Sequence, residues 1–243
     1  MAPVERRPPE PPSSERGRRA ERILDAAAEI LASWGYARVT IDDVARRAGV
    51  GKGTIYLHFA TKEELFLNVV MRSQFRLIAR LVEDLRDDPA TVLLSDVCRR
   101  IYLWAHEDPV IHAVLVRDME TLGALVRTTA ELAGDLFQER MRATDAYLAV
   151  LREHGLVRDD TPVPLQRHAM AAVITGFLTV EPVTPAKIPE PEECAGALAD
   201  VIRSSFEISH DPAAMRTAAA EAADIFQRLH ERFETEIGGR TSN

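Results

Sequence analysis

Residues 40–66 read TIDDVARRAGVGKGTIYLHFATKEELF, and this stretch decides the fold. Thr40 is a suitable N-cap for a helix, and Asp43 follows at the position of the acid in a capping box. Gly49 is placed to end that helix, and a second short helix begins near Lys52. The first helix carries an apolar stripe at helical spacing, made of Ile41, Val44, Ala45 and Ala48. Two short helices joined by a tight glycine turn predict a helix-turn-helix.

The run GVGKGT at residues 49–54 is similar to the phosphate-binding loop of adenylate kinases. Such a loop has the pattern G-x-x-x-x-G-K-[ST] between a buried β-strand and a helix, because its backbone N–H groups must curl around phosphates. Here Arg46 stands at the first glycine position, Gly53 follows Lys52, and an amphipathic helix precedes the loop. These differences disfavour a nucleotide-binding enzyme, an alternative that an ATP-binding assay would distinguish.

The rest of the chain predicts an all-α protein, because its runs of Ala, Leu, Glu and Arg favour helices. A long helix over residues 61–86 begins at the N-cap Thr61 and stops at Asp88 and Pro89. At 1.5 Å per residue its length is about 39 Å, enough to link two domains mechanically. The other expected helices cover residues 18–34, 90–106, 109–117, 124–154, 163–180, 191–207 and 211–236.

The net charge of −8 is unevenly distributed along the 243 residues. Residues 1–74 carry 12 Lys and Arg against 10 Asp and Glu, whereas residues 75–243 carry 18 against 28. A weakly basic N-terminal part can approach a polyanion, while the acidic remainder should avoid one. The larger part of the chain must therefore do another job.

The sequence gives no indication of a metal site, a disulfide or a membrane span. Cys98 and Cys194 lie far apart, without Cys or His partners at metal-ligand spacing. Charges and prolines occupy the N-terminus where a secretory signal needs apolar residues, and no apolar run approaches the roughly 18 residues of a membrane helix. We expect a cytoplasmic protein that contacts no membrane and has no cofactor, metal or catalytic residues.

The 40–66 stretch closely resembles the signature of the TetR family of bacterial transcriptional regulators. The shared features are a cap Thr, an Ala-Gly-Val turn, a Lys-Gly-Thr helix start, a Tyr-x-His-Phe end and Lys-Glu-Glu-Leu. The resemblance covers about residues 18–72. It implies a three-helix DNA-binding domain at residues 16–62, with the helix-turn-helix at about 40–59, and a helical effector-binding and dimerisation domain at residues 63–243. Residues 1–15 have the composition of a disordered tail.

The same resemblance implies that the helix beginning near Lys52 enters the DNA major groove. Ile55 and Phe59 point inward, so the opposite face is available to DNA; Gly53 lets the backbone approach base edges, and Thr54 can touch a base. The expected DNA-binding residues are Thr40, Lys52, Gly53, Thr54, Tyr56, His58 and Lys62. Five arginines, Arg6, Arg7, Arg16, Arg18 and Arg19, either form a DNA-contacting arm or belong to a solvated tail.

For the larger domain, the resemblance implies dimerisation and effector binding. We nominate helix 163–180 with one of the two helices within 191–236 as the dimer interface, because of their Gly and Ala positions; packing within one chain is the alternative. Candidate residues for the effector pocket are Tyr102, Trp104, His112, Phe137, Met141, Tyr147 and Phe177, each of which is also a candidate for ordinary core. His112 and His168 stand alone and predict no metal site.

The predicted protein is a homodimeric repressor that binds a palindromic operator in double-stranded DNA and is released by a small-molecule effector. A regulator controlled by a protein partner is a further alternative, and release by a metabolite extract would argue against it. The sequence determines neither the operator, the effector, the regulated genes nor the sign of regulation.

Overall fold

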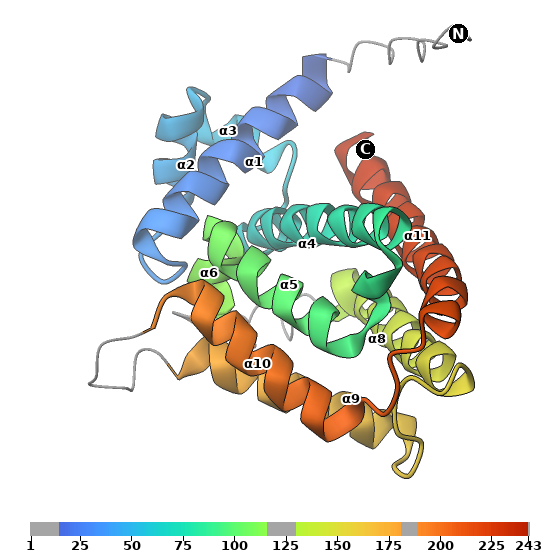
Figure 1. Cartoon of the computed structure of the whole chain (residues 1–243). Helices are drawn as coiled ribbons and strands as arrows, with labels where there is room; N and C mark the ends of the chain where they lie inside the picture. Colours follow the sequence, from blue (N-terminus) through green and yellow to red (C-terminus); the bar gives the residue numbers. More distant parts are fainter. Residues whose placement is uncertain (1–14, 116–129, 181–188, 243) are drawn as a thin grey trace, which may run out of the picture.

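The computed structural model describes residues 15–115, 130–180 and 189–242, and all regular elements within these ranges are helices. The helices form a small N-terminal head joined to a larger body (Figure 1). No helix among these residues is both long and apolar enough to cross a membrane. The predicted all-α class is confirmed.

The head consists of α1 (Glu15–Trp34), α2 (Ile41–Ala48) and α3 (Lys52–Tyr56). α1 packs against α2, and α2 packs against α3. Gly49 ends α2 in the left-handed region at φ 67°, where its N–H reaches the carbonyl oxygens of Ala45 and Arg46. Glycine suits this position because it has no Cβ to clash. The predicted helix-turn-helix and its glycine turn are confirmed.

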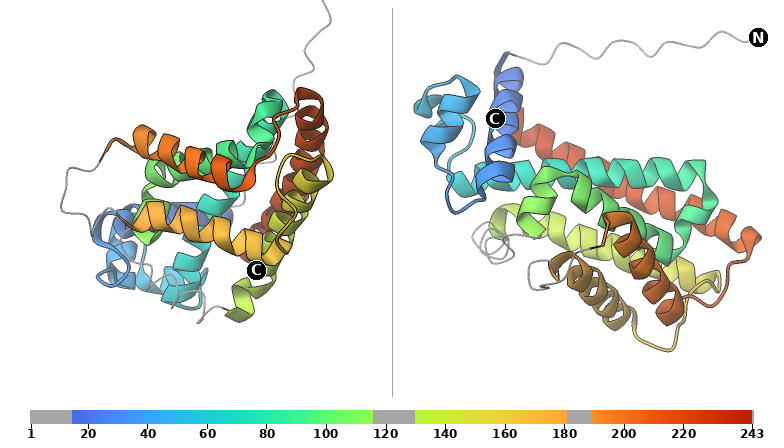
Figure 2. Two further views of the ribbon diagram at one scale, coloured as in Figure 1. Left: turned by 60° about the horizontal axis from the view of Figure 1, so that its bottom comes forward. Right: turned by 60° about the vertical axis from the view of Figure 1, so that its left-hand side comes forward.

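The long helix α4 (Lys62–Asp87) leads from the head into the body. The Thr61 hydroxyl accepts the Glu64 N–H at 3.1 Å at its start, and Asp88 caps its end. The C-terminal helix α11 (Pro212–Ser242) packs along α4, and the two lie side by side in the right-hand view of Figure 2. Because α4 contacts both α1 of the head and α11, a displacement of α4 would change the packing of both.

The body has three layers of helices. α4 and α11 form one outer layer, α5 (Leu94–Glu107) and α8 (Ala130–Glu153) lie in the middle, and α9 (Val163–Thr179) with α10 (Pro191–Phe206) forms the other outer layer (Figure 1). α6 (Pro109–Leu115) contacts α1, α4 and α5. One continuous apolar core runs through head and body.

The single helix expected over residues 90–106 was wrong at its first turn. A 3-10 helix, η1 (Pro89–Val92), precedes α5, and Leu93 between them is extended. The Asp88 side chain accepts the Ala90 N–H at 2.9 Å, which starts the 3-10 turn immediately after α4. Residues 124–129 of the expected 124–154 helix lie outside the described residues, as does the expected tail up to residue 14.

Candidate nucleic-acid interface

Thr40 and Asp43 hold the start of α2 through reciprocal hydrogen bonds. The Thr40 hydroxyl accepts the Asp43 N–H at 3.2 Å, and the Asp43 carboxylate accepts the Thr40 N–H at 3.1 Å. The hydroxyl also donates to that carboxylate at 2.6 Å, and these hydrogen bonds hold the pKa of Asp43 below its usual value. The predicted capping box is confirmed, and it occupies the Thr40 hydroxyl within the chain.

α3 has one buried face and one exposed face. Ile55 and Phe59 are buried, while Lys52, Gly53 and Tyr56 are exposed. A Cβ placed on Gly53 would meet no atom within 4 Å, so the helix backbone itself is reachable from outside. Thr54, at the edge of this face, is half-buried. The exposed face thus combines an open backbone with hydrogen-bonding side chains, as base-edge recognition in a groove requires.

Lys52 occupies the N-terminal end of α3, where Gly51 is the N-cap and supplies no side-chain hydrogen bond. The Lys52 ammonium donates to Asp42 Oδ2 at 2.8 Å, and this contact raises the pKa of Lys52. Both side chains are largely exposed. Exposed pairs of this kind exchange readily with another anion such as a phosphate.

Lys62 differs from Lys52 because its ammonium is turned toward the protein. Its Nζ donates to the Tyr36 carbonyl oxygen at 3.0 Å and lies 4.2 Å from the centre of the Tyr36 ring. Burial lowers the pKa of Lys62. The Tyr36 hydroxyl in turn donates to Glu63 at 3.1 Å, and burial and Glu63 raise the pKa of Tyr36 to about 12. Lys62 therefore has an internal structural role beside any DNA contact.

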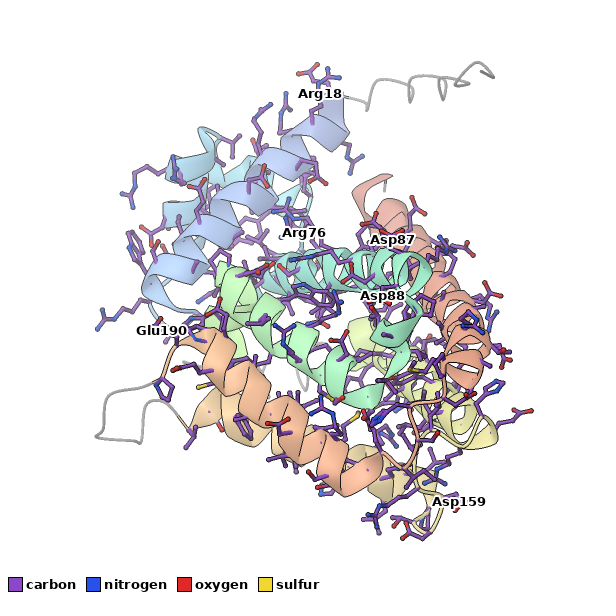
Figure 3. The ribbon with its side chains drawn as sticks, viewed as in Figure 1. Arg18, Arg76, Asp87, Asp88, Asp159 and Glu190 are labelled. Atoms are coloured by element: carbon purple, nitrogen blue, oxygen red, sulfur yellow. The ribbon has the colours of Figure 1, made fainter. Side chains whose placement is uncertain are left out.

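Two arginines of α1 lie beside the end of α3. Arg16 Nη2 donates to the Leu57 carbonyl oxygen at 3.4 Å. Burial, and then the positive charges of Arg16 and Arg19, lower the pKa of His58 below 6.5. Arg18 lies at the outer end of α1 (Figure 3). The structure thus brings His58 and part of the suggested arginine arm together, whereas Arg6 and Arg7 lie outside the described residues.

The run GVGKGT follows α2 and enters α3. Gly49 closes α2, and Gly51 and Lys52 open a helix of five residues. The strand that a nucleotide-binding loop would need is replaced by the helix α2 at this place.

Three of the seven residues nominated for an effector pocket come together on α5, α6 and α9. The buried Tyr102 ring lies edge-on to Phe177 at 6.5 Å and 4.3 Å from His106, whose ring is 5.5 Å from His112. His106 was not among the predicted pocket residues, although it lies one turn after Tyr102 on the same helix face. His106 Nδ1 lies 2.9 Å from the Tyr102 carbonyl oxygen and so donates to it, which leaves Nε2 as an acceptor in the neutral ring.

The other four nominated residues lie elsewhere. Trp104 lies under the Arg80 guanidinium at 4.9 Å, and Tyr147 is a core residue whose hydroxyl donates to the Val92 carbonyl oxygen at 2.8 Å. Met141 contacts Arg167, and Phe137 is 47% exposed. The structure therefore does not bring these four into one cluster with Tyr102.

The late helices nominated for the dimer interface, α9 with either α10 or α11, differ in burial. Four alanines of α11, which packs on α4, are buried within one chain: Ala218, Ala219, Ala222 and Ala223. In contrast, only Gln166 and Leu178 of the apolar helix α9 are buried. Its exposed residues include Leu165, Ala172 and Gly176. A Cβ added to Gly176 would meet nothing within 4 Å.

Residues 23–69 match the model of the family described as bacterial regulatory proteins, tetR family. The fatty acid metabolism regulator protein of Bacillus subtilis is 36% identical over 66 residues, which are 27% of this chain and 34% of that protein. The chain thus matches about a third of the length of this relative.

Two solved structures share the fold over most of the chain. The transcriptional regulator FadR from Bacillus subtilis, in complex with stearoyl-CoA, has a TM-score of 0.58 at 22% identity and covers 75% of this chain and 96% of its own. A regulator from Saccharomonospora viridis, in complex with choline, has a TM-score of 0.61 at 22% identity and covers 79% of this chain and 99% of its own. At these identities the likeness shows the fold.

Proposed function

This chain belongs to the tetR family of bacterial regulatory proteins, and we propose that it represses transcription as a homodimer on a palindromic operator. The observation that carries the proposal is the exposed face of α3, where an open glycine backbone lies among Lys52, Thr54 and Tyr56. Gly53 and Thr54 would approach base edges, while Lys52, Tyr56, His58 and Lys62 reach phosphates and the Thr40 end of α2 offers backbone N–H groups. The protein would act in the cytoplasm.

Dimerisation is proposed through α9 and α10. One helix-turn-helix reads a half-site, so two heads must be held about 34 to 36 Å apart or a multiple of that. Support comes from apolar side chains left uncovered in one chain: Leu165 is 56% exposed on α9, and Val201 is 41% exposed on α10. An exposed apolar face of this kind is typical of a protein interface. Because α11 packs along α4 while α10 contacts α9, α10 is the better partner for α9.

A small-molecule effector is proposed to bind beside the ring cluster of Tyr102, His106, His112 and Phe177. The cluster spans α5, α6 and α9, so an occupant would touch both α6, which contacts α4, and α9 of the dimer face. The two fold neighbours were solved with stearoyl-CoA and with choline, which supports a ligand-responsive body here. Typical coupling of roughly 1 to 3 kcal/mol would weaken DNA binding about 5 to 150-fold.

The proposal is tested with a labelled duplex from the region upstream of the protein's own gene and its neighbours. Fluorescence anisotropy should show saturable binding that an excess of unrelated duplex does not remove, and a protein-free metabolite extract should release it. Binding without sequence preference would overturn the operator proposal. Specific binding that no metabolite fraction affects would overturn the effector proposal and favour control by a protein partner.

A further inference from the structure

A cavity lies where the head meets the body, and none of the rings of the Tyr102 cluster lines it. Its volume is about 560 Å³, within the range of small-molecule sites. One wall comes from α1 and the others from α4, α5 and α6. Of the residues nominated for an effector pocket, Trp104 is the one that lines this cavity. An occupant would therefore bridge the head and the body.

The α4 wall of the cavity carries three guanidinium groups in a row. Arg72, Arg76 and Arg80 are spaced four residues apart, so they lie on one helix face about 6 Å from each other along the axis. Figure 3 shows Arg76 between α1 and the body helices. The apolar part of the lining is Ala28, Leu77, Trp104, Val110 and Ile111. The cavity thus pairs an apolar surface with a row of guanidinium groups.

The carboxylates of the lining are already engaged. Asp25 binds Arg72 at 2.8 Å, Glu107 binds Arg80 at 2.9 Å, and Glu29 pairs with Arg47 of α2. Asp108 uses one oxygen to accept the N–H groups of Val110 and Ile111 at the start of α6, at 2.9 and 3.1 Å. A cationic ligand would have to displace a close partner from Asp25, Glu29 or Glu107.

Of the three arginines, Arg76 is paired least closely. Arg76 has the longest ion pair of the cavity, 3.5 Å to Asp108, and otherwise donates to Ser73 Oγ at 3.2 Å. Its side chain is 56% exposed. The Arg72 guanidinium already pairs with Glu21 at 3.0 Å and with Asp25 at 2.8 Å, although its buried Nε has no hydrogen-bond acceptor among the described residues. Guanidinium groups bind oxyanions bidentately, so an incoming oxyanion would pair with the guanidinium of Arg76, which the chain leaves loosely paired.

We propose that this junction cavity binds an amphipathic anion, in which an apolar body packs on Leu77 and Trp104 while a carboxylate, phosphate or sulfonate group binds Arg76. The cavity shares α5 and α6 with the proposed effector region but is lined by none of its four rings, and the proposal does not depend on DNA binding.

The test uses the full chain and two probes with the same apolar body, anilinonaphthalene sulfonate and the uncharged N-phenylnaphthylamine. The chain has two tryptophans, and Trp34→Phe leaves Trp104 in the cavity wall as the reporter. We expect probe emission excited through Trp104 to saturate at one site, with the sulfonate bound at least tenfold more tightly than the uncharged probe.

Two variants in the Trp34→Phe background separate the cavity from other sites. Arg76→Gln should weaken sulfonate binding at least tenfold and leave the uncharged probe within twofold, and Ala28→Leu should weaken both by filling the α1 wall. Arg86→Gln on α4, whose guanidinium contacts Gln227 outside the cavity, is the matched control and should bind both probes normally. Thermal unfolding verifies that each variant is folded. Equal affinity for the two probes, or unchanged sulfonate binding in folded Arg76→Gln and Ala28→Leu, would overturn the proposal.

Discussion

At the scale of single residues, α3 has a buried face that holds it in the head and an exposed face that is free to contact DNA. Ile55 is fully buried and fixes the helix to the head, whereas Gly53 on the opposite side has open space around it. This division lets a substitution on the outer face change DNA binding without changing the fold. Local sequence spacing predicted it, because the inward positions of a short helix follow from its period.

Gly53→Ala is expected to separate stability from DNA binding. An added methyl meets no atom of the chain, and alanine is a better helix former than glycine by about 0.5 to 1 kcal/mol. The free energy of unfolding should therefore stay the same or rise, while operator affinity falls because the methyl holds the backbone away from base edges. Denaturant unfolding and anisotropy measure the two effects; unchanged operator affinity would count against close backbone approach.

The two lysines are expected to act on DNA phosphates. Lys52→Ala and Lys62→Ala should each lower affinity for all sequences and reduce the slope of log affinity against log salt by about one unit. Arg203→Ala, on α10 and paired with Asp200, is the control and should leave the slope unchanged. If the Lys62→Ala protein keeps the full slope, the contacts of Lys62 with Tyr36 are its main role.

His58 is expected to make operator binding depend on pH. Its pKa lies below 6.5 in the folded protein, because of burial and of Arg16 and Arg19, and a nearby phosphate would raise it. DNA binding then takes up a proton, so affinity should rise as the pH falls from about 7.5 to 6, by on the order of tenfold for each unit of pKa change. The binding constant measured across this range should lose this dependence in His58→Gln.

The stability of the free protein should change in the opposite direction. Because the unfolded His58 binds a proton more readily than the folded one, this residue's contribution to stability is lost as the pH falls through about 6.5. An affinity that is flat in pH, or equal pH dependence in His58→Gln, would place His58 away from the phosphates.

At the scale of elements, the sequence predicted what local residues determine. Thr40, Gly49 and Thr61 marked helix ends through capping and a left-handed turn, and the structure has helix ends at each. Contacts between segments far apart in the sequence could not be predicted, because no local residue pattern indicates them. The pairing of Arg72 with Asp25, and the turning of Lys62 toward Tyr36, depend on how α1 packs on α4. The residues predicted for one pocket lie in separate places in the structure. Tyr102 and Trp104, for example, are two residues apart and so lie on different faces of α5.

The exposed face of α9 provides the element-scale prediction. Ala172→Arg places a charge in the middle of this face and should convert the dimer to a monomer, because a charge buried at an apolar interface is costly. Ala220→Arg, an exposed alanine on α11, is the matched control and should leave the dimer intact. Sedimentation velocity measures both. A dimeric Ala172→Arg protein would move the interface away from α9.

At the scale of the whole molecule, charge and shape are divided between head and body. Residues 1–74 carry a small positive excess, while residues 75–243 carry 18 Lys and Arg against 28 Asp and Glu. The acidic body would be repelled from DNA, so the head alone should approach it, and α4 connects the two. The sequence predicted this division, while the cavity between α1 and α4 became visible only in three dimensions.

Operator recognition by α3 is tested most directly by selection of duplexes from a random library with the purified protein, followed by sequencing. We predict enrichment of a palindrome whose half-site centres lie one helical turn of about 10 base pairs, or a multiple of it, apart. Thr54→Ala should alter bases within each half-site without changing their spacing. Enrichment of no sequence, or of the same motif by a protein whose α3 face carries Gly53→Glu and Tyr56→Ala, would contradict the account.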